Sequence, residues 1–125
     1  MNRYDLVKAG IDVNAALNRF GNDVDTYEQI LSEFLKDPHY QEMTDAIKAG
    51  DCPSAFSAAH ALRDIAGNLS LIDLYDALNP LVEALRKGCL EDAEQAFEPV
   101  PALYHKLVEA IQNQPKKVRN AWMNG

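Results

Sequence analysis

No run of apolar residues in this sequence approaches the ~20 that a membrane-spanning helix requires. An unbroken apolar stretch is also missing after Met1–Asp5, so we expect no signal peptide and a cytoplasmic location. Basic residues are few: 12 Lys and Arg stand against 19 Asp and Glu, which gives a net charge of -7. Because proteins neutralise nucleic-acid phosphates with Lys and Arg, this balance argues against a general nucleic-acid binder. We therefore expect neither a membrane nor a nucleic acid among the partners.

Patterns typical of disulfides, metal sites and hydrolases are scarce as well. Cys52 and Cys89 show no Cys-x-x-Cys spacing, so we expect two reduced thiols. Di-iron helical bundles carry Glu-x-x-His pairs, and no such pair occurs here. A Ser–His or Cys–His hydrolase is disfavoured because a helical bundle offers no shaped oxyanion hole. The sequence thus predicts no metal and no cofactor, and it predicts that His39 and His105 are surface residues.

Most of the chain shows apolar periodicity at helical spacing, interrupted by turn residues. At 125 residues, with 47% hydrophobic and 25% charged residues, the chain fits one globular domain. A short apolar pattern lies over residues 6–17, and we expect longer helices over residues 27–35, 40–47, 53–69, 71–85 and 93–111. Pro80 is expected to kink the helix that contains it. In the last helix the pattern continues in phase through Pro99 and Pro101, which favours one kinked helix over two separate ones.

The helical periodicity predicts an all-α fold. The connections between the helices are short, and closely connected helices pack as antiparallel neighbours. The expected architecture is an antiparallel up-and-down four-helix bundle with one or two short N-terminal helices. We assign residues 1–114 to this domain and residues 115–125 to a basic C-terminal tail, which either frays or packs Trp122 against the bundle. We expect a monomer.

The segment over residues 53–70 places His60 opposite its apolar face. On a helical wheel at about 100° per residue, the apolar residues lie between about 140° and 240° from His60. They are Ala55, Ala58, Leu62, Ile65, Ala66 and Leu69. A histidine in this position faces solvent, and a neutral imidazole nitrogen is a competent nucleophile near pH 7.

The residues one helical turn from His60 suit phosphoryl chemistry. Arg63 and Asp64 follow it at i+3 and i+4, and Phe56 and Ser57 precede it at i−4 and i−3. The planar guanidinium of Arg63 can stabilise negative charge on phosphoryl oxygens. Phosphoryl transfer depends mostly on positioning and charge stabilisation, so such a module can rely on a partner for the metal and the acidic pocket.

Gly67, at i+7 from His60, removes a side chain from the same face. A glycine within a helix costs roughly 1 kcal/mol relative to alanine. Close approach of another backbone or of a partner surface would explain that cost, and a merely tolerated weakness is equally compatible with the sequence.

The stretch from Ala59 to Ser70 resembles the active helix of histidine-containing phosphotransfer (HPt) domains, whose pattern runs A-H-x-L-K-G-x-A/S-x-x-L/I-G. The matching positions are Ala59, His60, Leu62, Ala66 and Leu69. Arg63 is a cationic replacement for the lysine of the pattern, and Asp64 and Ser70 stand where the family has glycine. The resemblance covers about residues 5–111, which is nearly the whole chain.

This resemblance implies a histidine phosphotransfer protein of a two-component phosphorelay. His60 would accept a phosphoryl group from the receiver-domain aspartate of a hybrid sensor kinase and pass it to a response regulator. Arg63 would orient the phosphoryl group, and the protein would be a carrier rather than a stand-alone enzyme. The face on which the partners dock would comprise Phe56, Ser57, Asp64 and Gly67.

Asp64 leaves an alternative open. Its carboxylate would repel an incoming phosphoryl group, by about 1 kcal/mol at a few ångströms in water. The alternative is therefore a degenerate HPt-fold adaptor or inhibitor that binds receiver or kinase domains without phosphotransfer. A helical scaffold with an unrelated role is a third possibility.

Overall fold

The computed structural model describes residues 1–115, and within that range every regular element is an α-helix. The elements are α1 (Arg3–Lys8), α2 (Val13–Arg19), α3 (Val24–Phe34), α4 (His39–Lys48), α5 (Cys52–Asn68), α6 (Ile72–Arg86), α7 (Leu90–Phe97) and α8 (Val100–Gln112). The all-α class that the periodicity predicts is confirmed.

Side-chain caps fix where several helices begin. Asp12, Asp23 and Asp51 each accept a hydrogen bond from the backbone N–H three residues further on, at 3.1 Å. This pairing satisfies a donor that the first turn of a helix would otherwise leave without a partner. Asp51 begins α5, the helix that carries His60, and hydrogen bonds from Ser54 lower the pKa of the Asp51 carboxyl.

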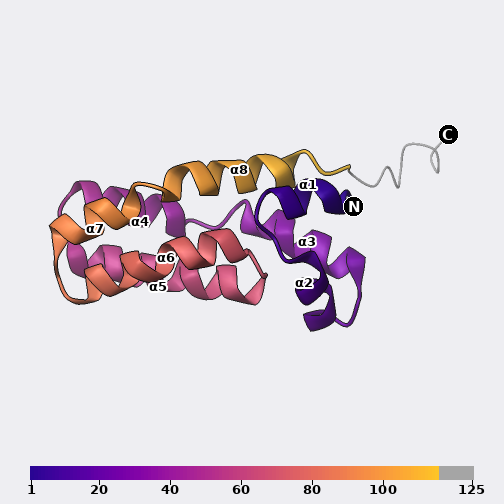
Figure 1. The fold of residues 1–125 in the computed structure, drawn as a ribbon, viewed down its shortest axis with the longest axis horizontal. Coiled ribbons are helices and arrows are strands. Elements are labelled where there is room, and N and C mark those ends of the chain that lie inside the picture. The colour runs from indigo at the N-terminus through magenta and orange to yellow at the C-terminus, as the bar shows by residue number, and fades with distance from the viewer. Residues whose placement is uncertain (116–125) are drawn as a thin grey trace.

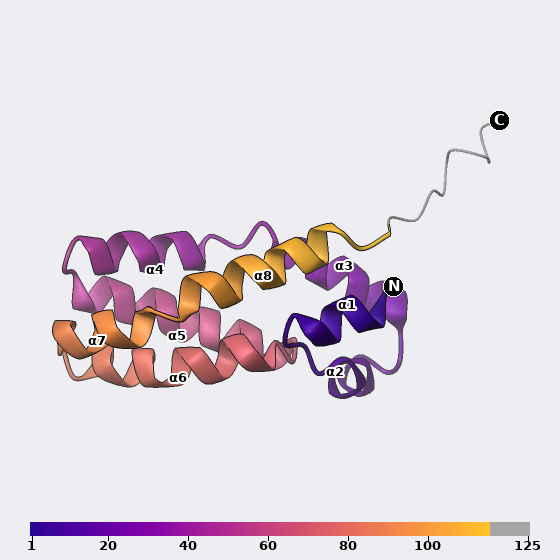
Figure 2. The same cartoon turned by 45° about the horizontal axis from the view of Figure 1, so that its top comes forward.

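Helices α4, α5 and α6 lie side by side, and the chain reverses direction between each of them (Figures 1 and 2). Helix α7 packs on α6 and contacts α4, whereas α8 extends from α6 to α1 and α3. The three N-terminal helices thus lie at one end of the molecule, beside the far end of α8 (Figure 2). Helix α5 is held between α4 and α6 and presents its remaining side to solvent.

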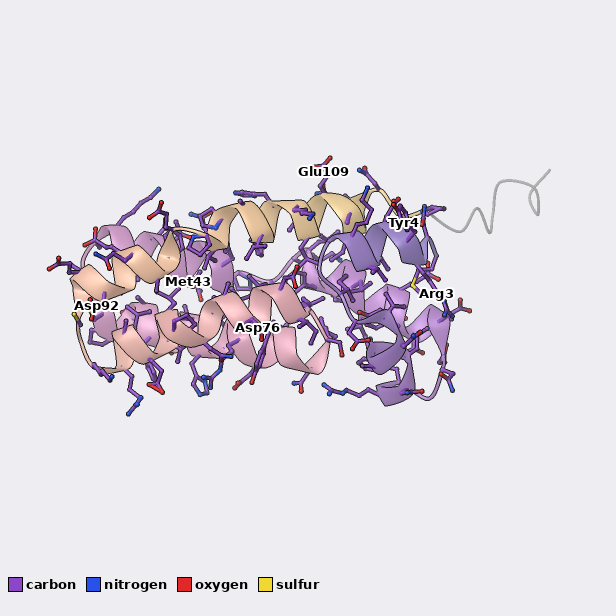
Figure 3. The ribbon with its side chains drawn as sticks, viewed as in Figure 1. Arg3, Tyr4, Met43, Asp76, Asp92 and Glu109 are labelled. Carbon is purple, nitrogen blue, oxygen red and sulfur yellow. The ribbon has the colours of Figure 1, made fainter. Side chains whose placement is uncertain are left out.

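The interior receives side chains from all eight helices of the described residues. Its largest fully buried side chains are Leu6, Tyr27, Leu31, Met43, Leu62, Leu71, Leu74, Leu78, Leu81, Val100 and Leu107. In Figure 3 Met43 points between the helices, whereas Asp92 and Glu109 point outward. Helix α5 contributes mainly small residues to this core, which lets α4 and α6 approach it closely; these are Ala55, Ala58, Ala59 and Ala66.

The prediction of one continuous helix over residues 93–111 is wrong, because α7 ends at Phe97 and α8 begins at Val100. The N–H of Glu98 donates to the carbonyl of Gln95, three residues back, which closes the last turn of α7 tightly. Pro99 and Pro101 have no N–H, so two hydrogen bonds of a continuous helix would be missing within one turn. Helix α6, by contrast, continues through the single exposed Pro80.

Backbone hydrogen bonds join the N-terminal helices to the turn between α5 and α6. The N–H of Asp12 donates to the carbonyl of Ser70 at 2.9 Å, and the N–H of Asp73 donates to the carbonyl of Gly10 at 3.1 Å. These two bonds form what we call the N-terminal brace. Gly10 has a φ of +93°, and a Cβ there would lie 2.5 Å from the side chain of Asp73, so only glycine fits.

Tyr27 of α3 adds a buried link to the same end of α5. Its hydroxyl donates to the carbonyl of Leu69 at 2.8 Å, and its ring is fully buried. Burial, together with the nearby negative charge of Asp12, raises the pKa of Tyr27 well above the usual range for a phenol. The C-terminal end of α5 and the turn after it are therefore held by the connection between α1 and α2 and by Tyr27 of α3.

The two ends of the described chain also meet. The N–H of Asn2 donates to Oε1 of Gln114 at 2.6 Å, two residues after α8 ends. The expected behaviour of the basic tail, including any packing of Trp122, lies outside the described residues. Within residues 1–115 no helix combines the length and the apolar character needed to cross a membrane.

Candidate functional site

His60 lies in the middle of α5, on the side away from the buried alanines. Its side chain is 46% exposed, while its neighbours Ala59 and Leu62 are fully buried. The residues of the apolar arc are buried as the wheel predicts, except Ile65, which is half-buried. The imidazole is thus accessible to a reactant, while the helix that carries it is fixed by the core.

Two side chains flank the imidazole along the helix. On the N-terminal side, the ring of Phe56 lies tilted against it, with 5.7 Å between the ring centroids. On the C-terminal side, Oδ2 of Asp64 lies 3.3 Å from Nδ1 of His60. Ser57 lies exposed one helical turn before His60. The ring therefore has an apolar neighbour on one side and a carboxylate on the other, and its Nδ1 edge faces the carboxylate.

Arg63 contacts the other oxygen of the same carboxylate. Its Nε lies 3.8 Å from Oδ1 of Asp64, and only 25% of its side chain is exposed. Its positive charge also reaches α6, where it helps Arg86, the main cause, to lower the pKa of Glu83. Asp64 thus lies between the imidazole and the guanidinium, each of which faces one of its oxygens.

Gly67 provides the room for an aromatic ring of α6. A Cβ at this position would lie 3.0 Å from Cε1 and 3.2 Å from Cδ1 of Tyr75. The close approach that the sequence left open is therefore made within the chain, by a side chain of the next helix. The carbonyl of Gly67 also accepts a hydrogen bond from Nη1 of Arg19, at 2.7 Å.

These contacts border a surface hollow beside Asp64, with a volume of about 620 Å³. Its lining comes from three helices, α2, α5 and α6, and consists of Arg19, Asp64, Gly67, Asn68, Ile72 and Tyr75. Arg19, Asn68, Ile72 and Tyr75 are the members that sequence reasoning missed. The mid-helix glycine was the only sign of Tyr75, and nothing in the local pattern placed Arg19 of α2 against the end of α5.

His105 belongs to a separate aromatic cluster where side chains of α4 and α8 meet, and His39 lies beside this cluster in sequence but pairs with Asp37. Tyr40 and Tyr104 stack with 3.7 Å between their centroids, and burial raises the pKa of both phenols. His105 is exposed as predicted, and its ring lies edge-on to both tyrosines. The surface prediction for His39 is only partly right, since its side chain is 33% exposed and its Nδ1 lies 2.8 Å from Oδ1 of Asp37. This cluster joins α4 to α8 through Tyr40 and Tyr104, and His105 lies at its exposed edge.

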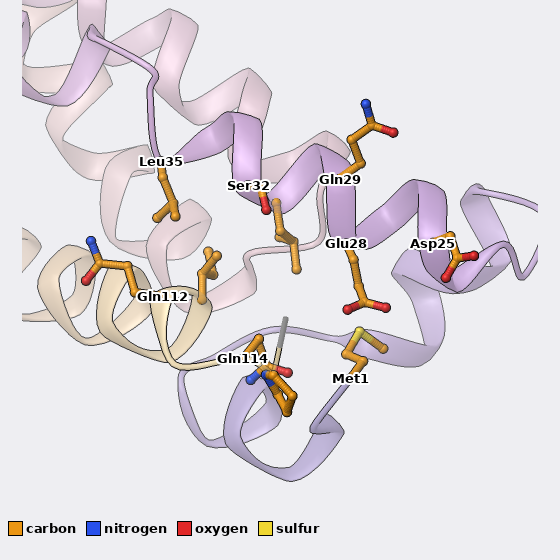
Figure 4. Close-up of a pocket in the computed structure, with 11 residues that line it drawn as sticks. Met1, Asp25, Glu28, Gln29, Ser32, Leu35, Gln112 and Gln114 are labelled. Carbon is orange, nitrogen blue, oxygen red and sulfur yellow. The ribbon is translucent and has the colours of Figure 1, made fainter. Parts of the chain in front are cut away.

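A larger pocket, of about 710 Å³, lies between α3 and α8 (Figure 4). Apolar side chains such as Leu35 share its wall with Glu28, Gln112 and Gln114. The only hydroxyl or thiol in its lining is that of Ser32, and no histidine belongs to that lining. The pocket therefore lacks a histidine in its lining, and it lies on helices that do not carry His60.

The remaining chemistry-bearing side chains form no second site in the described range. Cys52 and Cys89 are both free and half-buried. No group of three or more His, Cys, Asp or Glu side chains within residues 1–115 is arranged to hold a metal ion. Comparisons with protein-family models, with curated proteins and with solved structures find no match for this chain. Any functional assignment therefore rests on the α5 face.

Proposed function

We propose that the chain is a histidine phosphotransfer protein of a two-component phosphorelay. His60 accepts a phosphoryl group from the receiver-domain aspartate of a hybrid sensor kinase and passes it to a response regulator. The observation that carries this proposal is the placement of His60: a half-exposed imidazole on a helix whose opposite side packs into the core. A carrier needs such an imidazole, rigidly placed and open to a partner.

The proposed architecture is the antiparallel up-and-down four-helix bundle of HPt domains. Its members would be α4, α5, α6 and the pair α7 and α8, which follows α6 and packs on it. Short turns between α4, α5 and α6 support the antiparallel arrangement. The helices α1, α2 and α3 would be additions that hold the C-terminal end of α5.

The proposed reaction needs little from the chain besides its nucleophile. A neutral imidazole nitrogen attacks the phosphorus, the N–P bond forms, and the bond to the aspartyl oxygen of the partner breaks with its electron pair. Arg63 lies close enough to Asp64 to contribute positive charge at this face. The partner supplies the acidic pocket in which its own aspartate reacts, which makes the chain a carrier rather than a stand-alone enzyme.

The docking face in this proposal is the exposed side of α5 with the adjoining part of α6. Phe56, Ser57, Asp64 and Gly67 contribute from α5, and the hollow at Tyr75 extends the face. Such a surface combines an aromatic ring, small residues and a recess. We expect a receiver domain to approach the imidazole across this surface.

A second candidate function is favoured by one observation, the carboxylate of Asp64 beside the imidazole. An adaptor or inhibitor of the same fold would bind receiver or kinase domains at this face while Asp64 prevented transfer. Repulsion between a carboxylate and a phosphoryl group becomes stronger when a docked partner excludes water.

The test is phosphorylation by a purified receiver domain that has been labelled with a small-molecule phosphodonor. We expect acid-labile phosphate on His60, detected by mass spectrometry of the intact chain and its peptides. His60→Gln should abolish the label, whereas His105→Gln, a change at an exposed histidine of α8, should leave it intact. Receiver binding without any label would favour the adaptor, and the absence of both would refute both proposals.

A further inference from the structure

The pocket between α3 and α8 combines an apolar floor with an acidic rim. Its lining includes the buried Leu31 and Ile111 and the half-buried Leu35. Asp25 and Glu28 contribute carboxylates from α3, and the described lining contains no Lys, Arg or His. The volume of about 710 Å³ lies within the range of roughly 300–1,000 Å³ that is usual for binding pockets. The pocket therefore suits an occupant that presents an apolar group together with positive charge.

Glu28 is the acidic side chain that faces this space most directly. It is half-buried and points from α3 toward Met1 (Figure 4). Among residues 1–115, no Lys, Arg or His side chain forms an ion pair with its carboxylate. Partial burial weakens screening by water and salt, so a cation brought close to Glu28 is attracted more strongly than at an open surface.

The chain itself supplies such an occupant directly after the pocket. Pro115, the last described residue, belongs to the lining, so the C-terminal tail begins at the pocket wall. Residues 116–125 contain no acidic residue, one aromatic residue, Trp122, and three cations, which are Lys116, Lys117 and Arg119. An indole is a large apolar group, and the three cations complement the carboxylates of α3. The tail therefore matches the pocket in both respects.

We propose that the C-terminal tail docks in this pocket, with the Trp122 indole against the apolar floor and the basic side chains beside Asp25 and Glu28. This inference assigns an occupant to the pocket and does not depend on the proposed phosphotransfer at His60. The length of the tail permits the placement. Trp122 lies seven residues after Pro115, and an extended segment of that length spans about 23 Å, which leaves slack for a return to the adjacent wall.

Attachment to α8 favours the tail over a separate molecule. A group joined by a short linker acts at an effective concentration in the millimolar range, so one indole and a few ion pairs are enough to hold it. The N–H of a buried indole also needs an acceptor. The hydroxyl of Ser32 and the amide oxygen of Gln112 offer one within the lining.

Fluorescence tests this placement directly, because Trp122 is the single tryptophan of the chain. We expect its emission in the full chain to lie at shorter wavelength than in a peptide of residues 115–125. Acrylamide should quench it severalfold less than in the peptide. Both differences should be independent of protein concentration. Nuclear Overhauser effects should connect the indole protons to methyl groups of Leu35 and Ile111.

Substitutions in the lining should release the indole. Glu28→Lys reverses the charge at the rim and should move the emission toward that of the peptide. Leu35→Ala removes part of the apolar floor and should increase quenching by acrylamide. Glu109→Lys is the matched control, since it makes the same charge change at an exposed residue of α8 outside the lining (Figure 3), and it should leave the emission as it is. Circular dichroism of each variant shows whether the helices are retained.

Four results would overturn the placement. The first is an emission in the full chain equal to that of the peptide, and the second is a set of indole contacts to residues outside the pocket. The third is contacts that arise only at high protein concentration, which would assign the pocket to the tail of a second copy. The fourth is an identical emission of Glu28→Lys and Glu109→Lys when both variants keep their helices.

Discussion

Single residues decide what the α5 face can do. His60 is exposed because the alanines and leucines of α5 must be buried, and its ring orientation follows from Phe56 and Asp64 on either side. Asp64 is exposed to 56%, so a docking partner would meet its carboxylate directly. The carboxylate of Asp64 thus contributes directly to the charge that a docking partner meets beside His60.

Gly88 offers a test of backbone strain at a single residue. Its φ is +72°, and a Cβ there would meet no atom within 4 Å, so any cost of a side chain comes from the backbone alone. A left-handed conformation costs residues other than glycine roughly 1–2 kcal/mol, so we expect Gly88→Ala to lower the free energy of unfolding by about 1 kcal/mol. Chemical denaturation measures this change.

The neighbouring Lys87 provides the control for that measurement. It is exposed and has a φ of -78°, a conformation that alanine adopts without strain. Lys87→Ala should therefore stay within about 0.5 kcal/mol of the wild type. If Gly88→Ala proved as stable as Lys87→Ala, the left-handed turn after α6 would not constrain this position.

At the scale of helices, the pair Gly67 and Tyr75 shows how α5 and α6 fit together. Replacing a helical glycine by alanine stabilises the helix by roughly 1 kcal/mol. In the wild type, however, the new methyl group would lie 3.0 Å from the Tyr75 ring, which would have to shift. We expect Gly67→Ala to raise the free energy of unfolding by the full amount, roughly 1 kcal/mol, only in a Tyr75→Ala background.

A double-mutant cycle with chemical denaturation measures the difference between the two backgrounds. Residues in direct contact give coupling energies of about 0.5–3 kcal/mol. Equal effects of Gly67→Ala in the two backgrounds would show that the packing of the Tyr75 ring does not require a glycine at position 67. The glycine would then be a tolerated weakness, which is the other explanation that the sequence permits.

The helices differ in how well the sequence predicts them. The apolar spacing of α5 was sufficient to predict its approximate extent and the outward position of His60. The break at Pro99 was missed because the apolar pattern continues through it, although the backbone lacks two donors there. Arg19 could not be predicted, since its contact with Gly67 depends on how α2 packs rather than on any local pattern. Periodicity reports which face is buried and says little about which distant segment covers it.

For the molecule as a whole, the buried Tyr27 couples stability to alkaline pH. Its pKa is raised in the folded state, so the neutral phenol contributes stability that is fully present below the pKa of an unfolded tyrosine, about 10. Above that pH the unfolded chain loses the proton more readily, and the free energy of unfolding falls as pH rises. We expect Tyr27→Phe to reduce this fall, measured as thermal or denaturant stability between neutral pH and strongly alkaline pH.

We expect Tyr27→Phe also to lower the free energy of unfolding at neutral pH. It removes the hydrogen bond to the Leu69 carbonyl and leaves a buried acceptor without its donor, a loss of about 1–3 kcal/mol. Tyr40 and Tyr104 also have raised pKa values, so part of the alkaline loss should remain. Tyr4→Phe, at a side chain that is 69% exposed, should leave the pH dependence as it is. If the free energy of unfolding of Tyr27→Phe fell with alkaline pH as steeply as that of the wild type, Tyr27 would not be a source of the pH dependence.

The N-terminal brace also bears on the order in which the molecule assembles. Helices α4, α5 and α6 pack on their neighbours in sequence, whereas residues 10–12 pair with residues 70–73. Closing so long a loop costs more entropy than forming a local helix pair, so the local contacts form first. During synthesis the N-terminal helices emerge early, yet their docking surface does not exist until the turn between α5 and α6 has been made. We therefore expect the end of α5, where Arg19 of α2 donates to the carbonyl of Gly67, to be the last part of the proposed docking face to be completed.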